Sequence, residues 1–298
     1  MKILVPVDVS HPHEDLVSHL DWLADLKGNK VVLLFVKEIL PSYERVVESV
    51  ADFPEDWEHQ VEDKARQLLE TLAGKLKDKG IDVDVEVASG PTSSVINNIA
   101  SDQKVDLVAV SPGKQAHIRK FLLGSTSSNV VNHAPSSVLV LRDKEGHKKL
   151  DHVVFAVDGS KDSEYAMEFA VEKLKLKERQ VKASVVNVVS IAPVLGLISP
   201  APFIATLETN LLMEGEVIVA TALNKLRSLG LTDIETKVKA GDAAMEIIDY
   251  AEKHDAQLIV SGTKGHSAVA HILVGSVADR LSSHSSSSNL VVKIPDSH

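Results

Sequence analysis

The sequence predicts an α/β fold with two tandem, doubly wound, Rossmann-like domains, each built on a five-stranded parallel sheet. Short runs rich in Val, Ile and Leu alternate with helical patterns, which is typical of βαβ units. The second half of the chain repeats the order of the first at an offset of 150 to 152 residues. The length of 298 residues also favours two domains over one.

The first half contains five apolar runs and four helical segments. Apolar residues at helical spacing mark residues 55–79 as a helix with one buried stripe. The continuous run Val31–Val36 suits a parallel strand that is covered on both faces of its sheet. We expect strands at 2–7, 30–36, 82–88, 105–110 and 137–142, and helices at 12–26, 55–79, 92–103 and 125–133.

The two halves share polar residues as well as apolar runs. A Val-Asp-x-Ser motif ends the first strand of each half, and a Gly-Ser pair precedes the last helix of each half. The charged segment 143–149 between them has the composition of a solvated linker. We therefore expect one domain at 1–142 and a second at 151–295.

Composition excludes several classes of function. The chain has 32 Lys and Arg against 42 Asp and Glu, a formal net charge of -10, which disfavours nucleic acid as a main partner because its backbone is held by a basic stripe. It has no cysteine, which removes disulfides, thiolate nucleophiles and cysteine-based metal sites. These features fit a reducing cytoplasm, and we expect a cytoplasmic protein with no nucleic-acid partner.

The longest uncharged stretch, Ala183–Leu207, is long enough by count to span a bilayer. Three prolines, at 193, 200 and 202, interrupt it, so we expect no transmembrane segment. A buried strand followed by an apolar loop over 191–207 fits better. The loop could form a lid, a contact between domains or a partner surface, and the sequence does not choose among these.

A glycine-containing loop follows the fourth strand of the second half. It reads Ser-Gly-Thr-Lys-Gly-His over 261–266, and a Gly-Ser pair follows at 275–276 before a helical pattern. Glycines let backbone N–H groups converge on an anion, and a helix start adds a favourable dipole. The loop is neither a Walker motif nor a dinucleotide fingerprint. A phosphate cradle is the function it indicates.

These residues resemble the ATP-binding signature of the universal stress proteins, and the resemblance extends over nearly all of both halves. The residues that carry it are Gly262, Gly265, Gly275 and Ser276, together with Val157, Asp158 and Ser160. The resemblance implies a tandem universal stress protein with two adenine nucleotide alpha hydrolase-like domains. It also implies ATP as the ligand, with or without Mg²⁺.

The family's site residues can be assigned to this sequence only through the resemblance. Asp158 matches the acid that contacts the adenine, and Val188 matches the apolar residue beside the base and ribose. The residues that match the triphosphate loop, with their neighbours, are Gly262, Gly265, His266, Gly275, Ser276 and Val277.

The first half departs from this pattern. At the places of the two loop glycines it has Ser111 and Lys114, although Asp8, Gly124 and Ser125 remain. A lysine side chain would fill space where backbone should approach a phosphate. We expect one competent site in the second half and a degenerate one in the first, and whether the first binds anything is open.

Simpler interpretations of the same residues stay open. Asp8 and Asp158 could end their strands and help to cap the next helix, and Ser160 is better explained as a cap than as a nucleophile. His11 and His13 form the densest histidine cluster, but no second cluster has metal-ligand spacing beside them. We therefore expect no metal-binding or catalytic residues.

The expected function is nucleotide-dependent regulation in the stress response, with an adenine nucleotide and regulatory proteins as partners. The family resemblance places the fifth strands, 137–142 and 289–294, at the contact between two pseudo-dimeric halves, and a homodimer is a further possibility. One alternative is a slow ATPase or nucleotidyl transferase, for which no water activator is identifiable. The other is an adaptor that binds a protein or a hydrophobic ligand through 191–207 without using a nucleotide.

Overall fold

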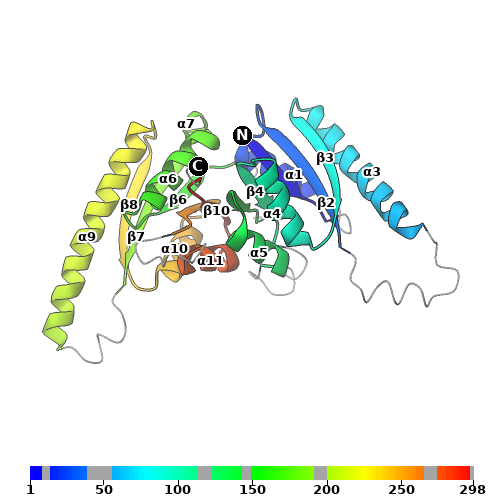
Figure 1. Ribbon diagram of the computed structural model, residues 1–298. Helices are drawn as coiled ribbons and strands as arrows, with labels where there is room; N and C mark the ends of the chain where they lie inside the picture. Colours follow the sequence, from blue (N-terminus) through cyan, green and yellow to red (C-terminus); the bar gives the residue numbers. More distant parts are fainter. Residues whose placement is uncertain are drawn as a thin grey trace.

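Strands from both halves of the chain join into a single ten-stranded sheet in the computed structural model, in the order β3-β2-β1-β4-β5-β10-β9-β6-β7-β8 (Figure 1). Within each half all neighbouring strands are parallel. The structure describes residues 1–8, 14–38, 56–112, 123–142, 149–190, 200–264 and 274–295, with only the backbone for 14–18.

The five strands expected in the first half are confirmed, with ends shifted by at most two residues. First-half strands are β1 Lys2–Pro6, β2 Lys30–Lys37, β3 Asp82–Ser89, β4 Leu107–Val110 and β5 Ser137–Val140. Second-half strands are β6 His152–Ala156, β7 Lys182–Val189, β8 Ile234–Ala240, β9 Leu258–Gly262 and β10 Ser288–Val292. The expected α/β class with two doubly wound halves is confirmed.

The four helices expected in the first half are also present. First-half helices are α1 Glu14–Ala24, α3 Trp57–Lys77, α4 Thr92–Asp102 and α5 Ser125–His133. Second-half helices are α6 Lys161–Lys173, α7 Leu176–Arg179, α9 Ala201–Ser228, α10 Ala243–Lys253 and α11 Ser276–His284. Within the described ranges no helix is long and apolar enough to cross a membrane.

The loop expected over 191–207 is wrong from Ala201 onward, because α9 begins there and continues for 28 residues. Pro200 is the N-cap of this helix and Pro202 lies in its first turn. Proline is tolerated in a first turn, because the N–H that it lacks would have no partner within the helix. Residues 191–199 lie outside the described part of the chain.

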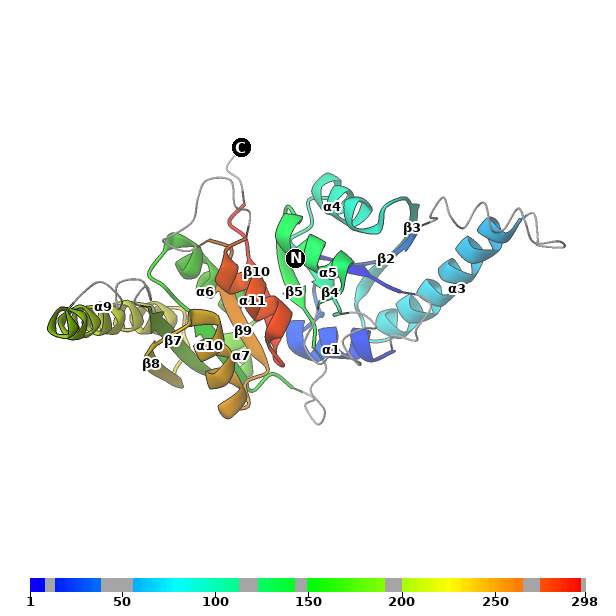
Figure 2. The same cartoon turned by 90° about the horizontal axis from the view of Figure 1, so that it is seen from below.

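The core has two layers, one on each side of the sheet. A single buried cluster lies under α1, α3, α6 and α9 and continues through both halves, with Leu139 of β5 and Leu290 of β10 in its middle. On the other side, one cluster packs under α4 and α5 and another under α10 and α11. Figure 2 shows α4 and α1 on opposite sides of the first-half strands. Each half is thus covered on both faces, as its apolar strands require.

The two halves meet at the only antiparallel pair of strands in the described sheet, β5 with β10. Leu139 lies opposite Leu290, at the centre of the register. The expectation that the fifth strands lie at the contact between the halves is therefore confirmed. Pairing removes two strand edges that would otherwise be open to other chains.

A cation next to each of these strands caps the last helix of the other half. The backbone N–H of Arg142 donates to Ser288 Oγ at 3.0 Å, and its Nη2 donates to the carbonyl oxygen of Ser282 in α11 at 2.7 Å. Lys293 makes the equivalent contacts with the serine that begins β5 and, at 3.3 Å, with the carbonyl oxygen of Ala134. Burial lowers the pKa of Arg142 to about 10, so it stays charged near neutral pH. Both cations interact favourably with helix carboxyl ends.

A buried polar network lies between β6, β7 and α10 in the second half. His152 Nε2 lies 2.8 Å from Ser184 Oγ, which also accepts a hydrogen bond from the Tyr250 hydroxyl at 3.2 Å. His152 Nδ1 lies 3.0 Å from the carbonyl oxygen of His254. The neutral ring satisfies both contacts, with Nδ1 donating and Nε2 accepting. Burial lowers the pKa of His152, and the nearby Lys182 adds to this effect.

We predict that acid destabilises the protein partly through His152. Its pKa is lower in the folded chain than in the unfolded chain, where it is about 6.5, so the unfolded state takes up the proton first. The free energy of unfolding should therefore be highest above about pH 6.5 and fall as the pH drops further. Urea denaturation followed by circular dichroism from pH 7.5 to 5 measures this dependence.

Acidification over the same pH range should lower the free energy of unfolding of His152→Gln by less than that of the wild type, although the variant is less stable at pH 7.5. His133→Gln is the matched control, because His133 is exposed at the end of α5. The prediction is wrong if wild type and His152→Gln lose stability in parallel on acidification.

Candidate functional site

The residues of the expected site lie at the carboxyl ends of β6, β7 and β9. Strand β6 pairs with β7 on one side and with β9 on the other. The connection after β6 leads to α6 on one face of the sheet, and that after β9 leads to α11 on the opposite face. Diverging connections open a crevice at this point, and ligands of doubly wound sheets bind there.

Asp158 is held in place just beyond β6. Its Oδ1 accepts hydrogen bonds from the N–H of Ser160 at 3.0 Å and from the Ser160 hydroxyl at 2.6 Å. The Ser160 Oγ accepts in turn from the N–H of Ser163 at 3.2 Å and caps α6. Gly159 between them has φ +80°, a conformation that favours glycine. The expected capping role of Ser160 is confirmed, and Asp158 supports that cap.

Asp162, in the first turn of α6, anchors the start of the glycine loop. Its Oδ1 accepts from the Thr263 hydroxyl at 3.0 Å and from the N–H of Lys264 at 3.2 Å. A Cβ added to Gly262 would lie 2.8 Å from the carbonyl carbon of Asp162. Glycine at 262 is therefore required by the close approach of α6, a packing reason that sequence reasoning did not identify.

The second Gly-Ser pair begins α11. The N–H of Gly275 donates to the carbonyl oxygen of Thr263 at 2.7 Å, which ties the helix start to the end of β9. Gly275 is the N-cap and, in the described part of the chain, no side chain caps this helix. Ser276 is exposed, whereas Val277 and Val188 both pack against the rim of one buried cluster. Among the described residues, the start of α11 thus lacks the side-chain acceptor that α6 has.

Asn187 is a further residue at this edge that sequence reasoning missed. Its Nδ2 donates to the carbonyl oxygen of Val157 at 2.8 Å and so ties the ends of β6 and β7 together. Its buried Oδ1 has no partner among the described residues and faces Gly215 of α9, where an added Cβ would lie 2.8 Å away. Glycine at 215 lets α9 pack directly on this asparagine.

The structure brings together Asp158, Val188, Gly262, Gly275 and the start of α11. The remaining expected site residues, Gly265 and His266, lie outside the described residues, as does Lys114 of the first half. No sequence signal pointed to Asp162, because an acid in a first helical turn is common and its partners are about 100 residues away.

The first half keeps the same link between strand and helix. The N–H of Gly124 donates to the carbonyl oxygen of Pro112 at 2.9 Å, as Gly275 does to Thr263. In addition, the Ser127 hydroxyl donates to the carbonyl oxygen of Ser111 at 2.7 Å. Ser111 and Pro112 therefore permit the same link between strand end and helix start that Thr263 makes in the second half.

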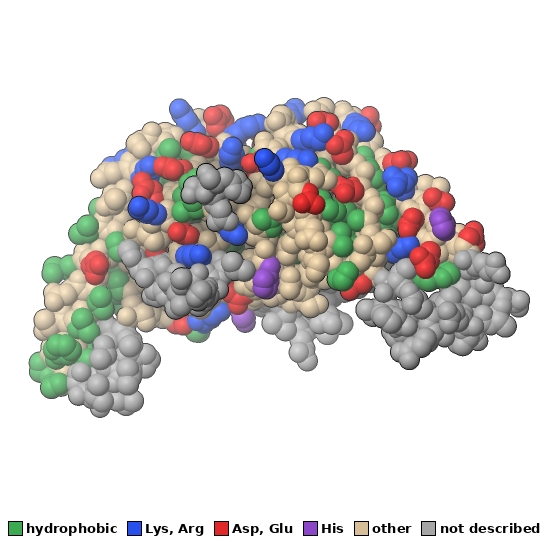
Figure 3. Space-filling model, viewed as in Figure 1, with side chains coloured by type: hydrophobic (Ala, Val, Ile, Leu, Met, Phe, Trp, Pro, Cys, Tyr) green, Lys and Arg blue, Asp and Glu red, His purple; other side chains and the backbone are tan. Residues whose placement is uncertain are grey.

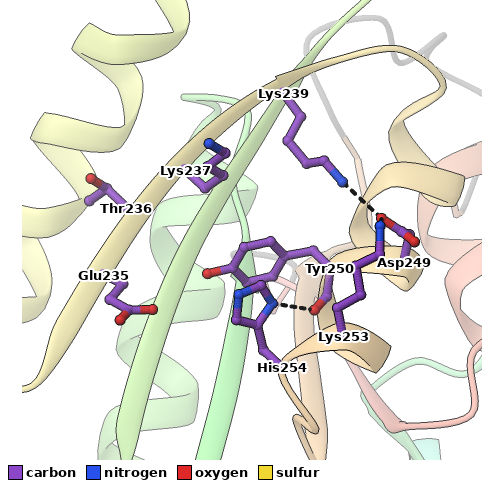
Figure 4. Close-up of a pocket in the computed structure, with 8 residues that line it drawn as sticks. All are labelled: Glu235, Thr236, Lys237, Lys239, Asp249, Tyr250, Lys253 and His254. Atoms are coloured by element: carbon purple, nitrogen blue, oxygen red, sulfur yellow. Dashed lines mark hydrogen bonds and ion pairs between the residues drawn. The ribbon is translucent and has the colours of Figure 1, made fainter.

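A groove of about 460 Å³ lies elsewhere, between β8 and α10 (Figure 4). None of the expected site residues lines it. The ring of His254 stacks on that of Tyr250 with centroids 4.0 Å apart, and Lys239 forms ion pairs with Glu246 and Asp249. With the ion pairs of Lys182 with Glu235 and of Lys253 with Asp249, they make this groove part of a salt-bridged outer edge of the sheet.

Comparison with known proteins gives consistent matches. The model of the universal stress protein family matches residues 1–142 and 149–293. A universal stress protein of Methanocaldococcus jannaschii is 34% identical over 152 residues, covering 51% of this chain and 87% of its own. One from Synechocystis is 22% identical over 294 residues, covering 92% and 93%. The crystal structure of a universal stress protein from Archaeoglobus fulgidus shares the fold, with a TM-score of 0.67 and 18% identity over 99% of this chain and 97% of that one.

We predict that Asp162 orders the segment after β9. Asp162→Ala removes the acceptor of two hydrogen bonds and should lower the free energy of unfolding by about 1–2 kcal/mol. It should also speed amide hydrogen exchange at Lys264. Denaturation and exchange mass spectrometry measure the two effects. Asp162→Asn, which keeps an oxygen acceptor of the same shape, is the control and should retain most of the protection. Equal protection in the alanine variant would refute this role.

Proposed function

Because the chain belongs to the universal stress protein family, we propose that it binds ATP through its second half and acts as a nucleotide-dependent regulator of the stress response. The proposed domains are 1–142 and 151–295, with the intact loop in the second. The observation that carries the proposal is the start of α11, which follows the carboxyl end of β9 at the same sheet edge as Asp158 and Val188 and has no described side-chain cap.

The described residues fit an adenine nucleotide. The Asp158 carboxylate would accept hydrogen bonds from the base, and Val188 would contact the base and ribose. The N–H groups of Ser276 and Val277, at the positive end of the α11 dipole, would hold phosphate oxygens. Gly265 and His266 complete the proposed loop. A bound Mg²⁺ would neutralise part of the phosphate charge.

We propose that the two halves differ in occupancy. The start of α5 resembles that of α11, because Gly124 caps it without a side chain in the described chain. Yet the first half has Ser111 and Lys114 in place of two glycines. A long side chain at 114 competes with a phosphate for the approach to the backbone. The second half would then hold about one nucleotide per chain.

In this proposal ATP is a ligand whose occupancy changes a surface that other proteins recognise. Such regulation requires that ATP bind two states of the chain with different affinity. Asp162 and Thr263 are the residues best placed to link ATP occupancy to that surface, because they join the loop to the first turn of α6. We place this activity in the cytoplasm.

The first test is to denature freshly purified protein and to identify and count any nucleotide that is released. Chromatography with mass spectrometry should give about one ATP per chain if one half is competent. About two per chain would contradict the proposed asymmetry. No release, together with no binding of added Mg·ATP, would contradict nucleotide binding altogether.

A matched pair of variants tests the assignment of the loop. Gly265→Lys copies the first-half residue Lys114 and should weaken ATP binding about ten- to a hundredfold, since it blocks hydrogen bonds to a charged ligand. Lys114→Gly, the reverse change in the other half, should leave the second-half site unchanged. Isothermal titration calorimetry measures both, and thermal unfolding confirms that each variant is folded. Unchanged affinity in Gly265→Lys would overturn the assignment.

A further inference from the structure

The outer face of α9 carries apolar side chains that nothing in the described structure covers. The buried residues of the helix, among them Gly215 and Val219, pack against the sheet. On the other side, Phe203, Met213 and Val217 are 55%, 59% and 67% exposed. Figure 3 shows hydrophobic side chains gathered at the α9 end of the molecule. Exposed apolar side chains in one stripe mark an interaction surface more often than isolated ones do.

The first half provides an internal comparison for this face. Four of the five buried residues of α3 lie 150 positions before the buried residues of α9: Ala65, Leu69, Leu72 and Leu76 correspond to Gly215, Val219, Ala222 and Leu226. By the same offset, Met213 and Val217 correspond to Asp63 and Gln67, which are exposed. The fold therefore does not require apolar residues there, and the second half alone has acquired them.

Helix α9 is also longer than its counterpart. Its residue 207 corresponds to Trp57, the first residue of α3 in the described part of the chain, so α9 begins six residues earlier than α3 as described. Six residues extend a helix by about 9 Å. The extension carries no charged side chain and contains Phe203. It lengthens the apolar stripe beyond the part of α9 that packs on the sheet (Figure 1).

The stripe is symmetric about Asn210. Phe203 and Val217 each lie seven residues from it, and Leu207 and Met213 each lie three residues from it. If two α9 helices cross antiparallel at Asn210, each apolar residue meets an apolar residue of the other helix. The two Asn210 amides then meet on the axis, where each offers both a donor and an acceptor. A surface that complements itself in this way fits a two-fold pair of identical chains.

The charges on α9 also favour a second copy of this chain as the partner. Glu214 is the one charged residue on the stripe, and antiparallel pairing places it opposite Thr206, whereas parallel pairing would place it opposite its own copy. Between residues 201 and 224 the helix has acidic residues but no Lys or Arg. Helices that lie on anionic membranes carry basic residues on their polar face, so a membrane surface is a poorer fit.

The size of the contact predicts a weak, reversible pair. The stripe from 203 to 217 is about 21 Å long, and two helices packed over this length bury on the order of 1,000 Å² in total. That area is near the lower limit for a specific interface. We propose that two copies of this chain associate through antiparallel contact of their α9 helices, centred on Asn210.

The test is sedimentation velocity on the full chain from about 1 µM to about 500 µM. The wild type should shift from monomer to dimer with concentration. The double variant Met213→Asp with Val217→Gln, which copies the first-half residues, should raise the dissociation constant at least about tenfold without changing the thermal midpoint. A wild type that stays monomeric, or a double variant that dimerises equally, would overturn the proposal.

A cross-linking measurement tests the centre of the contact separately. The chain has no cysteine, so Asn210→Cys introduces a single thiol. A short bismaleimide should join this variant into covalent dimers faster than Gln60→Cys, the exposed equivalent position in α3. Equal rates would refute the antiparallel contact at Asn210. Co-sedimentation of monomers with phosphatidylcholine vesicles would instead assign the stripe to a membrane and overturn the proposal.

Discussion

The pairing of β5 with β10 is the interaction on which the rest of the molecule depends. It joins two parallel five-stranded layers into one sheet and gives the chain a core cluster that is continuous across both halves. Arg142 and Lys293 then act on opposite sides of the junction, each on the last helix of the other half. Because those helices also begin at the Gly-Ser pairs, α5 and α11 connect the contact between the halves to the carboxyl edge of the sheet in each half.

The two halves share one strand order but differ in several polar contacts. The second half has Asp162 holding the loop, Asn187 beneath Gly215, and the buried network of His152. At the position of His152 the first half has Lys2, since both begin the first strand of their half. These differences lie at the carboxyl edge, at the start of the first strand and on the outer helix, whereas the strand order and the bounds of the last helix in each half correspond.

Most of the fold could be predicted from the sequence, because apolar runs and helical spacing are local signals. The wrong prediction at α9 has a local cause too: Pro200 and Pro202 indicate a break in a helix, but they lie at a helix start, where proline is tolerated. The site could be predicted only in part. The contact of Asp162 with Thr263 joins residues 101 apart, so no pattern within a single segment reveals it. The loop motif predicts the glycine at 262, but not that the close approach of α6 is what requires it.

The covalent link between the halves has a consequence for how such a protein can change over generations. In a pair of separate identical subunits, one substitution alters both sites and both outer helices at once. Here one gene encodes both partners of the β5 and β10 contact, so each can mutate alone while the junction keeps them together. One half can lose a ligand and still serve as the scaffold of the other, which is free to acquire new surfaces.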